Sequence, residues 1–337
     1  MNGREWIRKS VLQRRELPVP YNFMFSPPAS AALARHFGRA DVAEAIALPI
    51  RMTSPKSIKP LYAAAAKYGP TIKDEFGVVW STSDIDRGSP VGPCCVGDDL
   101  SGYQFPDPAA EYRFEDIGRW CLQNREHYTF VWVGDLWERA TFMRGMERLL
   151  LDVATAPANV EELLRGLADY ILATMEILFD RFEFDGVALS DDYGAQSAML
   201  ISPADWRRLV GPLLAEIYNL AKRHGRSVFH HSCGNIVPIV PDLIDIGLDI
   251  LHPIQPEAMD IQHLKREFGA DLSFCGGLGT QKLLPAGLPG QIRAQVRRLK
   301  ETMGAGGGYI LEPGITVQAD VPLDNMLAMI DEAQKPL

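Results

Sequence analysis

The sequence has few cysteines, no run of basic residues and no long apolar stretch. Five cysteines are an odd number in a chain of 337 residues, which argues against a disulfide framework. A net charge of −9 without a basic run argues against binding to nucleic acid or to an anionic membrane. No apolar stretch reaches the roughly 20 residues that cross a bilayer. The charged N-terminus lacks the apolar region of a signal peptide, so we expect a cytoplasmic protein.

Nucleotide-binding fingerprints are also missing, because neither GxGxxG nor GxxxxGK[ST] follows the first expected strand. The chain instead alternates short apolar runs with helical patterns. Strands are expected at 18–25, 45–52, 128–133, 186–190, 227–231, 249–253, 272–275 and 308–311. Helical patterns follow most of them, which predicts an α/β fold, a (β/α)₈ TIM barrel forming one domain over residues 1–337. An open doubly wound sheet is the alternative.

Two segments stand outside this alternation. The first 18 residues are charged and amphipathic, and they predict an N-terminal helical extension. Residues 54–127 are too many for one crossover and are rich in proline and glycine, which predicts a lid or insertion after the second strand. Cys94 and Cys95 lie in it, and adjacent cysteines seldom form a disulfide because the geometry is strained.

Polar side chains gather at the expected carboxyl ends of the strands, where parallel barrels carry their chemistry. Each alone has an ordinary interpretation as a helix cap, a turn residue or a core residue. The fold would bring all of them into one ring. They are Asp135, Asp191, Asp192, Tyr193, His230, His231, Cys233, Asn235, His252, Gln255, Cys275 and Glu312.

The stretch VFHHSCGNI contains a possible pair of metal ligands. Strand alternation places His231 and Cys233 on one face of the strand and His230 on the opposite face. Imidazole and thiolate ligands favour Zn²⁺, and a catalytic zinc keeps three protein ligands and one exchangeable position. Cys275 would supply the third ligand, and Glu312 or Asp192 the fourth. The alternative is a set of structural histidines and thiols.

Several segments together resemble the uroporphyrinogen decarboxylase superfamily, and more specifically its branch of zinc- and corrinoid-dependent methyltransferases. These are FDGVALSDDYGAQ, HHSCGNIVPIVPDLIDIGLDILHPIQP, FCGGLGTQKLLPAG, GGGYILEPGITVQADVPLDNMLAMI and the shorter DEFGVVW. The resemblance implies a (β/α)₈ barrel. It also implies that the H-x-C of the methyltransferases, which holds zinc, corresponds to His231 and Cys233.

Two departures from the family patterns narrow the function. Decarboxylases carry an arginine-containing RQAGR stretch after the first strand, but this chain has YNFMFSPPAS there, which argues against porphyrinogen decarboxylation. Methyltransferases acting on coenzyme M have a cysteine just after the proline and glycine of the final strand, where this chain has Ile315. Cys275 is therefore the expected third ligand, with Glu312 as the next choice.

The resemblance implies zinc-dependent transfer of a methyl group between a small methylated substrate and a corrinoid, for example O-demethylation of a methoxylated aromatic. The corrinoid signature D-x-H-x-x-G is absent, so the cobalamin is expected on a separate partner protein. Transfer from a methylcorrinoid to a thiol and a metal-free lyase acting on another carboxylated substrate remain alternatives. A barrel that binds a corrinoid or tetrapyrrole without catalysis is a third.

The oligomeric state stays open, with a homodimer as one option. The resemblance and the strand-end positions also suggest roles for individual residues. The expected roles are catalysis for Glu312 and Asp192, cofactor contact for Asn235 and Gln255, and substrate contact for Tyr21, Phe23 and Tyr193.

Overall fold

The structure is a computed structural model that describes residues 1–336 except 98 and 101. The strands are β1 Ile50–Thr53, β2 Thr71–Lys73, β3 Val79–Ser81, β4 Pro90–Gly92, β5 Tyr128–Gly134, β6 Gly186–Ser190, β7 Ser227–His231, β8 Ile250–Ile254, β9 Ser273–Leu278 and β10 Tyr309–Pro313. The α-helices are α1 Gly3–Ile7, α2 Pro27–Phe37, α3 Val42–Ala45, α4 Ala65–Tyr68, α5 Ile117–Gln123, α6 Trp137–Arg144, α7 Met146–Thr155, α8 Pro157–Arg181, α9 Pro203–Leu209, α10 Gly211–Arg223, α11 Val240–Asp245, α12 Ile261–Phe268, α13 Leu283–Ala286, α14 Pro289–Thr302 and α15 Leu323–Gln334. Short helical turns are η1 Arg8–Leu12, η2 Glu111–Arg113 and η3 Val237–Ile239.

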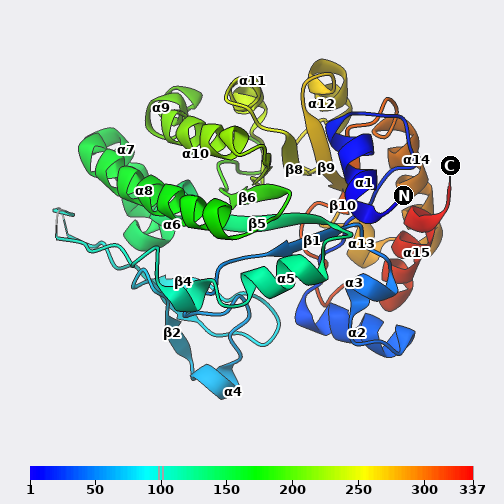
Figure 1. Ribbon diagram of the computed structural model, residues 1–337, viewed down its shortest axis with the longest axis horizontal. Coiled ribbons are helices and arrows are strands. Elements are labelled where there is room, and N and C mark those ends of the chain that lie inside the picture. Colours follow the sequence, from blue (N-terminus) through cyan, green and yellow to red (C-terminus); the bar gives the residue numbers. More distant parts are fainter. Residues whose placement is uncertain (98, 101, 337) are drawn as a thin grey trace.

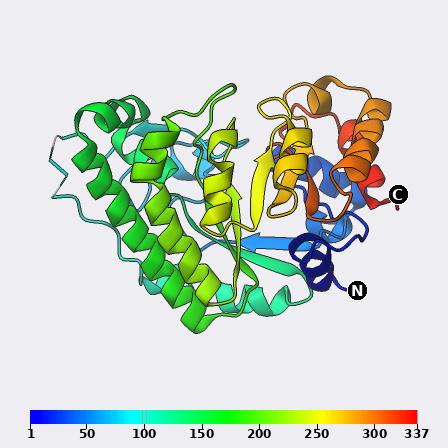
Figure 2. The same ribbon diagram turned by 90° about the horizontal axis from the view of Figure 1, so that it is seen from above.

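The main sheet is parallel and follows the order of the chain. Its order is β1-β5-β6-β7-β8-β9-β10, and each neighbouring pair is parallel. Figure 1 shows α8 to α12 in an arc outside the strands, and Figure 2 shows the same helices from above. The α/β fold and the curled parallel sheet of a TIM barrel are therefore confirmed.

The first expected strand, 18–25, differs from the prediction. It forms only isolated parallel bridges, from Tyr21 to Leu311 of β10 and from Phe25 to Val317. Pro20 has no N–H group to extend the bridge at Tyr21 toward the N-terminus, and Pro313 of β10 has none to donate between the two bridges, which explains why the ladder is interrupted. The described sheet thus has seven strands, and an extended segment lies beside β10 in the place of the eighth.

The helix boundaries follow signals in the sequence. The hydroxyl of Ser202 accepts a hydrogen bond from the backbone N–H of Asp205, and Pro203 occupies the first turn of α9. Gly225 follows α10 with φ +66°, a backbone conformation that glycine adopts without strain. No helix in the described part of the chain is both long and apolar enough to cross a membrane.

Two apolar clusters lie on the two faces of the strands. Phe130, Phe229 and Cys275 belong to the cluster inside the sheet, where Ile7 and Val11 of the N-terminal extension also pack. The other cluster joins the outer face of the strands to the helices. The extension is helical, as expected, and it fills one end of the curled sheet.

Residues 54–127 form the insertion that follows β1. They contain α4, η2, α5 and an antiparallel sheet in the order β2-β3-β4, which lies at the lower left of Figure 1. Residues 98 and 101 of this expected insertion lie outside the described part. Arg144 of α6 links the insertion to the helices, because its guanidinium donates to the carbonyl oxygen of Cys95 at 2.6 Å and to that of Gly97.

Candidate metal centre

The carboxyl ends of β6 to β10 bring six potential metal ligands into two neighbouring groups. Within each group, one ligand atom from each residue lies within 4.8 Å of the others. The first group is half-buried and the second is buried. The first contains Asp192, His231 and Cys233, and the second contains His252, Cys275 and Glu312.

The half-buried group has spacings that suit zinc. His231 Nε2 lies 3.4 Å from Cys233 Sγ and 3.4 Å from Asp192 Oδ1. Zinc bonds of about 2.0–2.1 Å to nitrogen or oxygen and about 2.3 Å to sulfur, at tetrahedral angles, separate the ligand atoms by about 3.3–3.6 Å. The backbone N–H of Cys233 also donates to Asp192 Oδ1 at 2.8 Å, which fixes the two loops relative to each other.

Charge interactions within this group are strong. Burial favours neutral His231, but hydrogen bonds with Asp192 and Cys233 outweigh burial and raise the pKa of His231 to about 10. Burial likewise opposes ionisation of Asp192, yet His231 lowers the pKa of that carboxyl to about 2. A cation is therefore favoured at this position, and Zn²⁺ carries the same sign of charge.

The buried group is centred on Glu312. Cys275 Sγ donates to Glu312 Oε2 at 2.8 Å, and His252 Nε2 lies 3.8 Å from the same oxygen. Asn22 Nδ2 donates to both carboxylate oxygens, at 3.1 and 3.2 Å. The contact of 2.8 Å is a hydrogen bond, because two ligands of one zinc ion would lie farther apart.

Burial dominates the ionisation of this second group. It raises the pKa of Glu312 to about 7, against the hydrogen bonds from Cys275 and Asn22. It also raises the pKa of Cys275 well above the usual thiol range, with Glu312 adding to the effect. Burial and the nearby charge of His231 lower the pKa of His252 far below that of a free imidazole. The second group is thus best described as neutral His252, a protonated thiol and a carboxyl shared with Asn22.

A contact between two histidines joins the groups. His231 Nδ1 and His252 Nδ1 lie 2.9 Å apart, and His252 Nε2 is buried without a hydrogen-bond partner among the described residues. One ring must donate through Nδ1 and the other must accept. If His231 donates, its Nε2 can bind a metal while His252 carries its proton on Nε2. Two neutral rings in this contact cannot both offer Nε2 lone pairs, so we expect one metal ion across the two groups.

The neighbouring strand positions support the loop that carries Cys233. Gln255 Oε1 accepts from the backbone N–H of Gly234 at 2.6 Å, and its amide donates to the carbonyl oxygen of Gly314 at 3.4 Å. His230 points away from this group and bonds through Nδ1 to the hydroxyl of Tyr218 on α10, at 2.6 Å. The opposite orientations of the two adjacent histidines agree with strand alternation.

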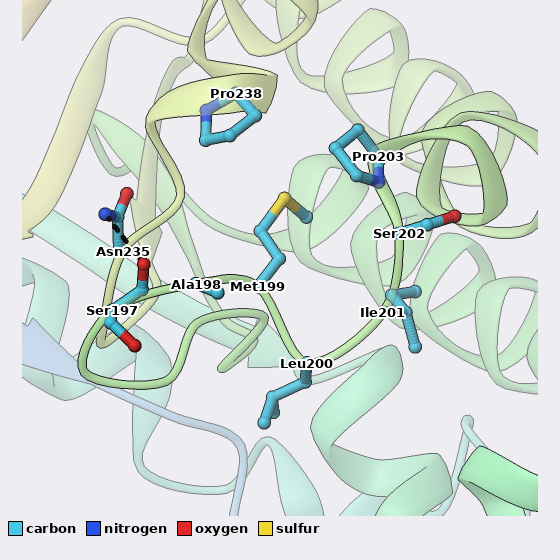
Figure 3. A pocket seen from close by; sticks show the side chains of 9 residues that line it. All are labelled: Ser197, Ala198, Met199, Leu200, Ile201, Ser202, Pro203, Asn235 and Pro238. Carbon is cyan, nitrogen blue, oxygen red and sulfur yellow. Dashed lines mark hydrogen bonds between the residues drawn. The ribbon is translucent and has the colours of Figure 1, made fainter.

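Asn235 lies at the edge of a hollow rather than in either group. The hollow has a volume of ≈ 380 Å³ and is lined by residues 197–203 with Asn235 and Pro238. Figure 3 shows Met199 pointing between Pro203 and Pro238, with Asn235 and Ser197 on the opposite side. None of the six potential ligands lines the hollow, so it adjoins the candidate metal centre without containing it.

The three residues expected to contact substrate are buried. Tyr193 donates to Asp191 Oδ2 at 2.8 Å, and Tyr21 donates to the carbonyl oxygen of Ile46 at 3.0 Å. Phe23 stacks on Tyr21, with ring centroids 5.4 Å apart. In this arrangement these rings support the backbone around the site.

Two contributors were missed in the selection of site residues, His252 and Asn22. His252 was noted only as a polar strand end, although it is buried between the two groups. Asn22 lies between Tyr21 and Phe23 in YNFMF, and only these two aromatic rings were expected to contact substrate. Alternation of side chains along that extended segment was the available signal, because it places Asn22 on the face opposite Tyr21 and Phe23.

A family model for uroporphyrinogen decarboxylase matches residues 124–336, more than half of the chain. The chain belongs to the uroporphyrinogen decarboxylase family. The family expected from the strand-end motifs is therefore confirmed, and the matched region contains all six potential ligands. No curated protein matches the sequence.

Solved structures place this family member among α/β barrels. A methyltransferase from Methanosarcina mazei has a TM-score of 0.73 and 16% sequence identity, and the match covers 99% of this chain and 98% of that one. At this identity the likeness shows the fold. An endo-beta-1,4-xylanase from Gloeophyllum trabeum matches with a TM-score of 0.41 and 10% identity, over 71% of this chain and 83% of that one. This likeness is too low to support a conclusion about the fold or the function.

Proposed function

We propose that this protein is a zinc-dependent methyltransferase that moves a methyl group between a small methylated compound and the corrinoid of a partner protein. The observation that carries the proposal is the set of ligand atoms in Asp192, His231 and Cys233: His231 Nε2 lies 3.4 Å from each of the other two, a spacing that fits two ligands of one tetrahedral zinc ion. Family membership and the fold shared with a methyltransferase support it. Demethylation of a methoxylated compound is the proposed direction.

In this proposal, His231 and Cys233 hold the zinc together with Asp192. A bound zinc supplies a Lewis acid that stabilises the negative charge left on the substrate heteroatom when the methyl group departs. The set expected from the sequence, with Cys275 and Glu312 completing the site, remains the alternative. In the proposed arrangement, His252 accepts from Nδ1 of His231, and Gln255 holds the loop that carries Cys233.

Membership of a family described as uroporphyrinogen decarboxylase favours a second candidate function, a metal-free lyase that acts on a carboxylated substrate. Metal content separates the two. We expect the purified protein to contain about one zinc per chain by mass spectrometry, and His231→Ala and Cys233→Ser to lose it while remaining folded by circular dichroism. Cys121→Ser is the matched control, because Cys121 is a buried thiol on α5 outside both groups.

Methyl transfer to cob(I)alamin is the corresponding activity assay. Cob(I)alamin absorbance should fall when the protein is supplied with methyl ethers, methylamines or methyl thioethers in turn. Zinc removal and the two ligand variants should abolish this change, while Cys121→Ser should retain it. An enzyme that is fully active without metal would refute the proposal.

A further inference from the structure

A second pocket, with a volume of ≈ 430 Å³, lies at the amino ends of the strands. This volume falls within the range of small-molecule sites. Ser227, the first residue of β7, lines the pocket, whereas His231, the last residue of the same strand, belongs to the candidate metal centre. The two sites are therefore at opposite ends of the sheet. The charged side chains that line this amino-end pocket are Arg4, Arg8, Lys222, Arg226, Asp185 and Asp249.

The N-terminal extension supplies one side of the amino-end pocket, and several contacts fix its position. The backbone N–H of Arg4 donates to the carbonyl oxygen of Glu126 at 2.9 Å, just before β5. Ile7 and Val11 of the same extension are buried in the apolar cluster inside the sheet. The side chains of Arg4 and Arg8 therefore reach the pocket from a backbone that is held against the barrel.

The carboxylate of Asp185 is shared by several donors. Its Oδ2 accepts from the backbone N–H and from the hydroxyl of Thr129, both at 3.1 Å. Its Oδ1 accepts from Nε of Arg4 at 2.7 Å and from Nη2 of Arg8 at 3.4 Å. Among the described residues, the remaining nitrogens of the two guanidinium groups have no hydrogen-bond partner. Arg4 and Arg8 therefore keep donors that a further acceptor can use.

Two buried hydroxyl groups that line the pocket add another donor. Tyr128 and Ser227 are 2% and 7% exposed, and their hydroxyl oxygens lie 2.8 Å apart. Only one of the two hydroxyls can donate in this contact. The O–H of the other therefore has no acceptor in the described part of the chain. An acceptor in the pocket would satisfy this buried donor, which is unfavourable without a partner.

The lining also has an excess of positive charge. Four basic side chains face two carboxylates, which leaves a difference of two positive charges. Lys222 pairs with Asp249. Arg226 pairs with Glu183, which lies outside the lining and has a side chain that is 89% exposed. Water screens an exposed carboxylate. Even if Glu183 is counted in full, four positive and three negative charges leave one positive charge.

We infer that the amino-end pocket binds the phosphate group of a small molecule. A phosphate dianion offers only acceptors, which match the unused donors of Arg4, Arg8 and the hydroxyl pair, and guanidinium groups bind phosphate in bidentate geometry. Its charge has the sign and size that the lining lacks. Because the pocket is larger than one phosphate group, a phosphate monoester with a small organic part suits it. This inference does not depend on the proposed methyl transfer.

Calorimetry with the full-length protein tests the pocket directly. Inorganic phosphate and phenyl phosphate, which are mainly dianions at pH 8, would be titrated at constant ionic strength in chloride buffer. We expect phenyl phosphate to bind at one site per chain, and phenol not to bind. Arg8→Met and Lys222→Met should each weaken this binding at least about tenfold, because each removes a charge-assisted hydrogen bond. Arg8→Lys should retain part of the affinity.

Lys9→Met is the matched control, because Lys9 lies in the same extension but pairs with Glu5 and does not line the pocket. It should bind phenyl phosphate as the wild type does, and circular dichroism should show that all variants are folded. The inference is overturned if neither phosphate compound binds, or if Arg8→Met and Lys222→Met bind as tightly as the wild type. Equal weakening in Lys9→Met and Arg8→Met also overturns it, because general attraction to surface charge would explain that result.

Hydrogen exchange followed by mass spectrometry locates the bound phosphate. A ligand held between Arg8 and Lys222 joins the N-terminal extension to the end of α10. Phenyl phosphate should therefore slow exchange in residues 1–12 of the wild type and leave exchange in these residues unchanged in Arg8→Met. Slower exchange that is confined to other parts of the chain would place the ligand elsewhere and overturn the inference.

Discussion

At the scale of single residues, the contact between His231 and His252 decides which imidazole nitrogen can bind a metal. His252 has no exposed surface, and its Nδ1 lies 2.9 Å from that of His231. Hydrogen-bond partners of metal-binding histidines fix the ring orientation and the tautomer. In the proposed arrangement His252 is thus a positioning residue for His231, even though it also belongs to the buried group of potential ligand atoms.

His252→Leu should lower zinc affinity by about 10–100-fold, because it removes the acceptor for Nδ1 of His231. His252→Asn should retain more affinity, since its amide oxygen offers an acceptor near the position of Nδ1. Competition with a zinc chelator measures both effects. His230→Asn is the control, because His230 is equally buried but bonds to Tyr218, away from the metal centre. Equal zinc affinity in His252→Leu and the wild type would exclude the positioning role.

The sequence predicted the orientation of side chains correctly where the alternation of faces along a strand was used. It missed Asn22, where that alternation was not used. His231 and His230 face opposite sides of β7, as their adjacent positions predict. Tyr21 was selected because it is aromatic, but the structure places the amide of Asn22 on Glu312. The same period of two residues would have indicated Asn22.

At the scale of elements, two loops at the ends of β6 and β7 pass in direct contact. A Cβ atom on Gly194 would lie 2.6 Å from the backbone nitrogen of Asn235 and 2.7 Å from the carbonyl oxygen of Cys233. A Cβ atom on Gly234 would lie 2.3 Å from the backbone of Gly194. Only glycine at both positions permits this approach, which brings Asp192 and Cys233 together.

Gly194→Ala should therefore separate the loops that carry two of the proposed ligands. We expect loss of zinc and of methyl transfer, with a folded barrel by circular dichroism. Gly225→Ala is the matched control, because no atom lies within 4 Å of its added Cβ and only the left-handed backbone is disfavoured. That control should retain zinc and lose about 1 kcal/mol of stability. Normal zinc binding by Gly194→Ala would show that the loops can separate without consequence for the site.

The elements themselves were largely predictable, but their hydrogen-bond partners were less so. Strands β5 to β10 fall within a few residues of the expected positions. The expected strand at 45–52 begins only at Ile50, because α3 ends at Ala45 and Ala47 has a positive φ of 51°. Apolar periodicity indicates extended backbone, whereas ladder formation depends on N–H groups and on the neighbouring segment.

At the scale of the whole molecule, a buried ion pair between α6 and α7 holds the arginine that bonds to the backbone of the insertion. Arg144 Nε lies 2.7 Å from Asp152 Oδ2, with side chains 0% and 1% exposed, while Nη1 donates to the carbonyl of Cys95. Arg148 binds the other oxygen of Asp152 at 2.8 Å. Losing the carboxylate would leave a buried guanidinium without its counter-charge.

Asp152→Asn should lower the free energy of unfolding at pH 7 by about 3–5 kcal/mol. Urea unfolding followed by tryptophan fluorescence measures this change. Glu161→Gln is the control, since Glu161 pairs with Arg208 at an exposed position and should change stability by less than about 1 kcal/mol. A loss for Asp152→Asn no larger than that of the control would contradict this role of the ion pair.

The same pair predicts a direction of pH dependence. Burial opposes ionisation of Asp152, but Arg144 and Arg148 lower the pKa of its carboxyl below the ordinary value. A carboxyl whose pKa is lower in the folded state stabilises the protein above the unfolded-state pKa of about 3.9 and loses that contribution as pH falls further. The difference in unfolding free energy between wild type and Asp152→Asn should therefore shrink below about pH 4. A constant difference from pH 7 to pH 3 would exclude this origin.

The sequence by itself determined the alternation of strands and helices, the family, and the short unit that places His231 beside Cys233. These features are local, because the periods of strands and helices and the spacing within a motif act over a few residues. Tertiary structure decided that Asp192 joins that unit and that His252 links it to the group of Cys275 and Glu312. These contacts depend on the curvature of the sheet and on loops that meet across long chain separations, which no local pattern specifies.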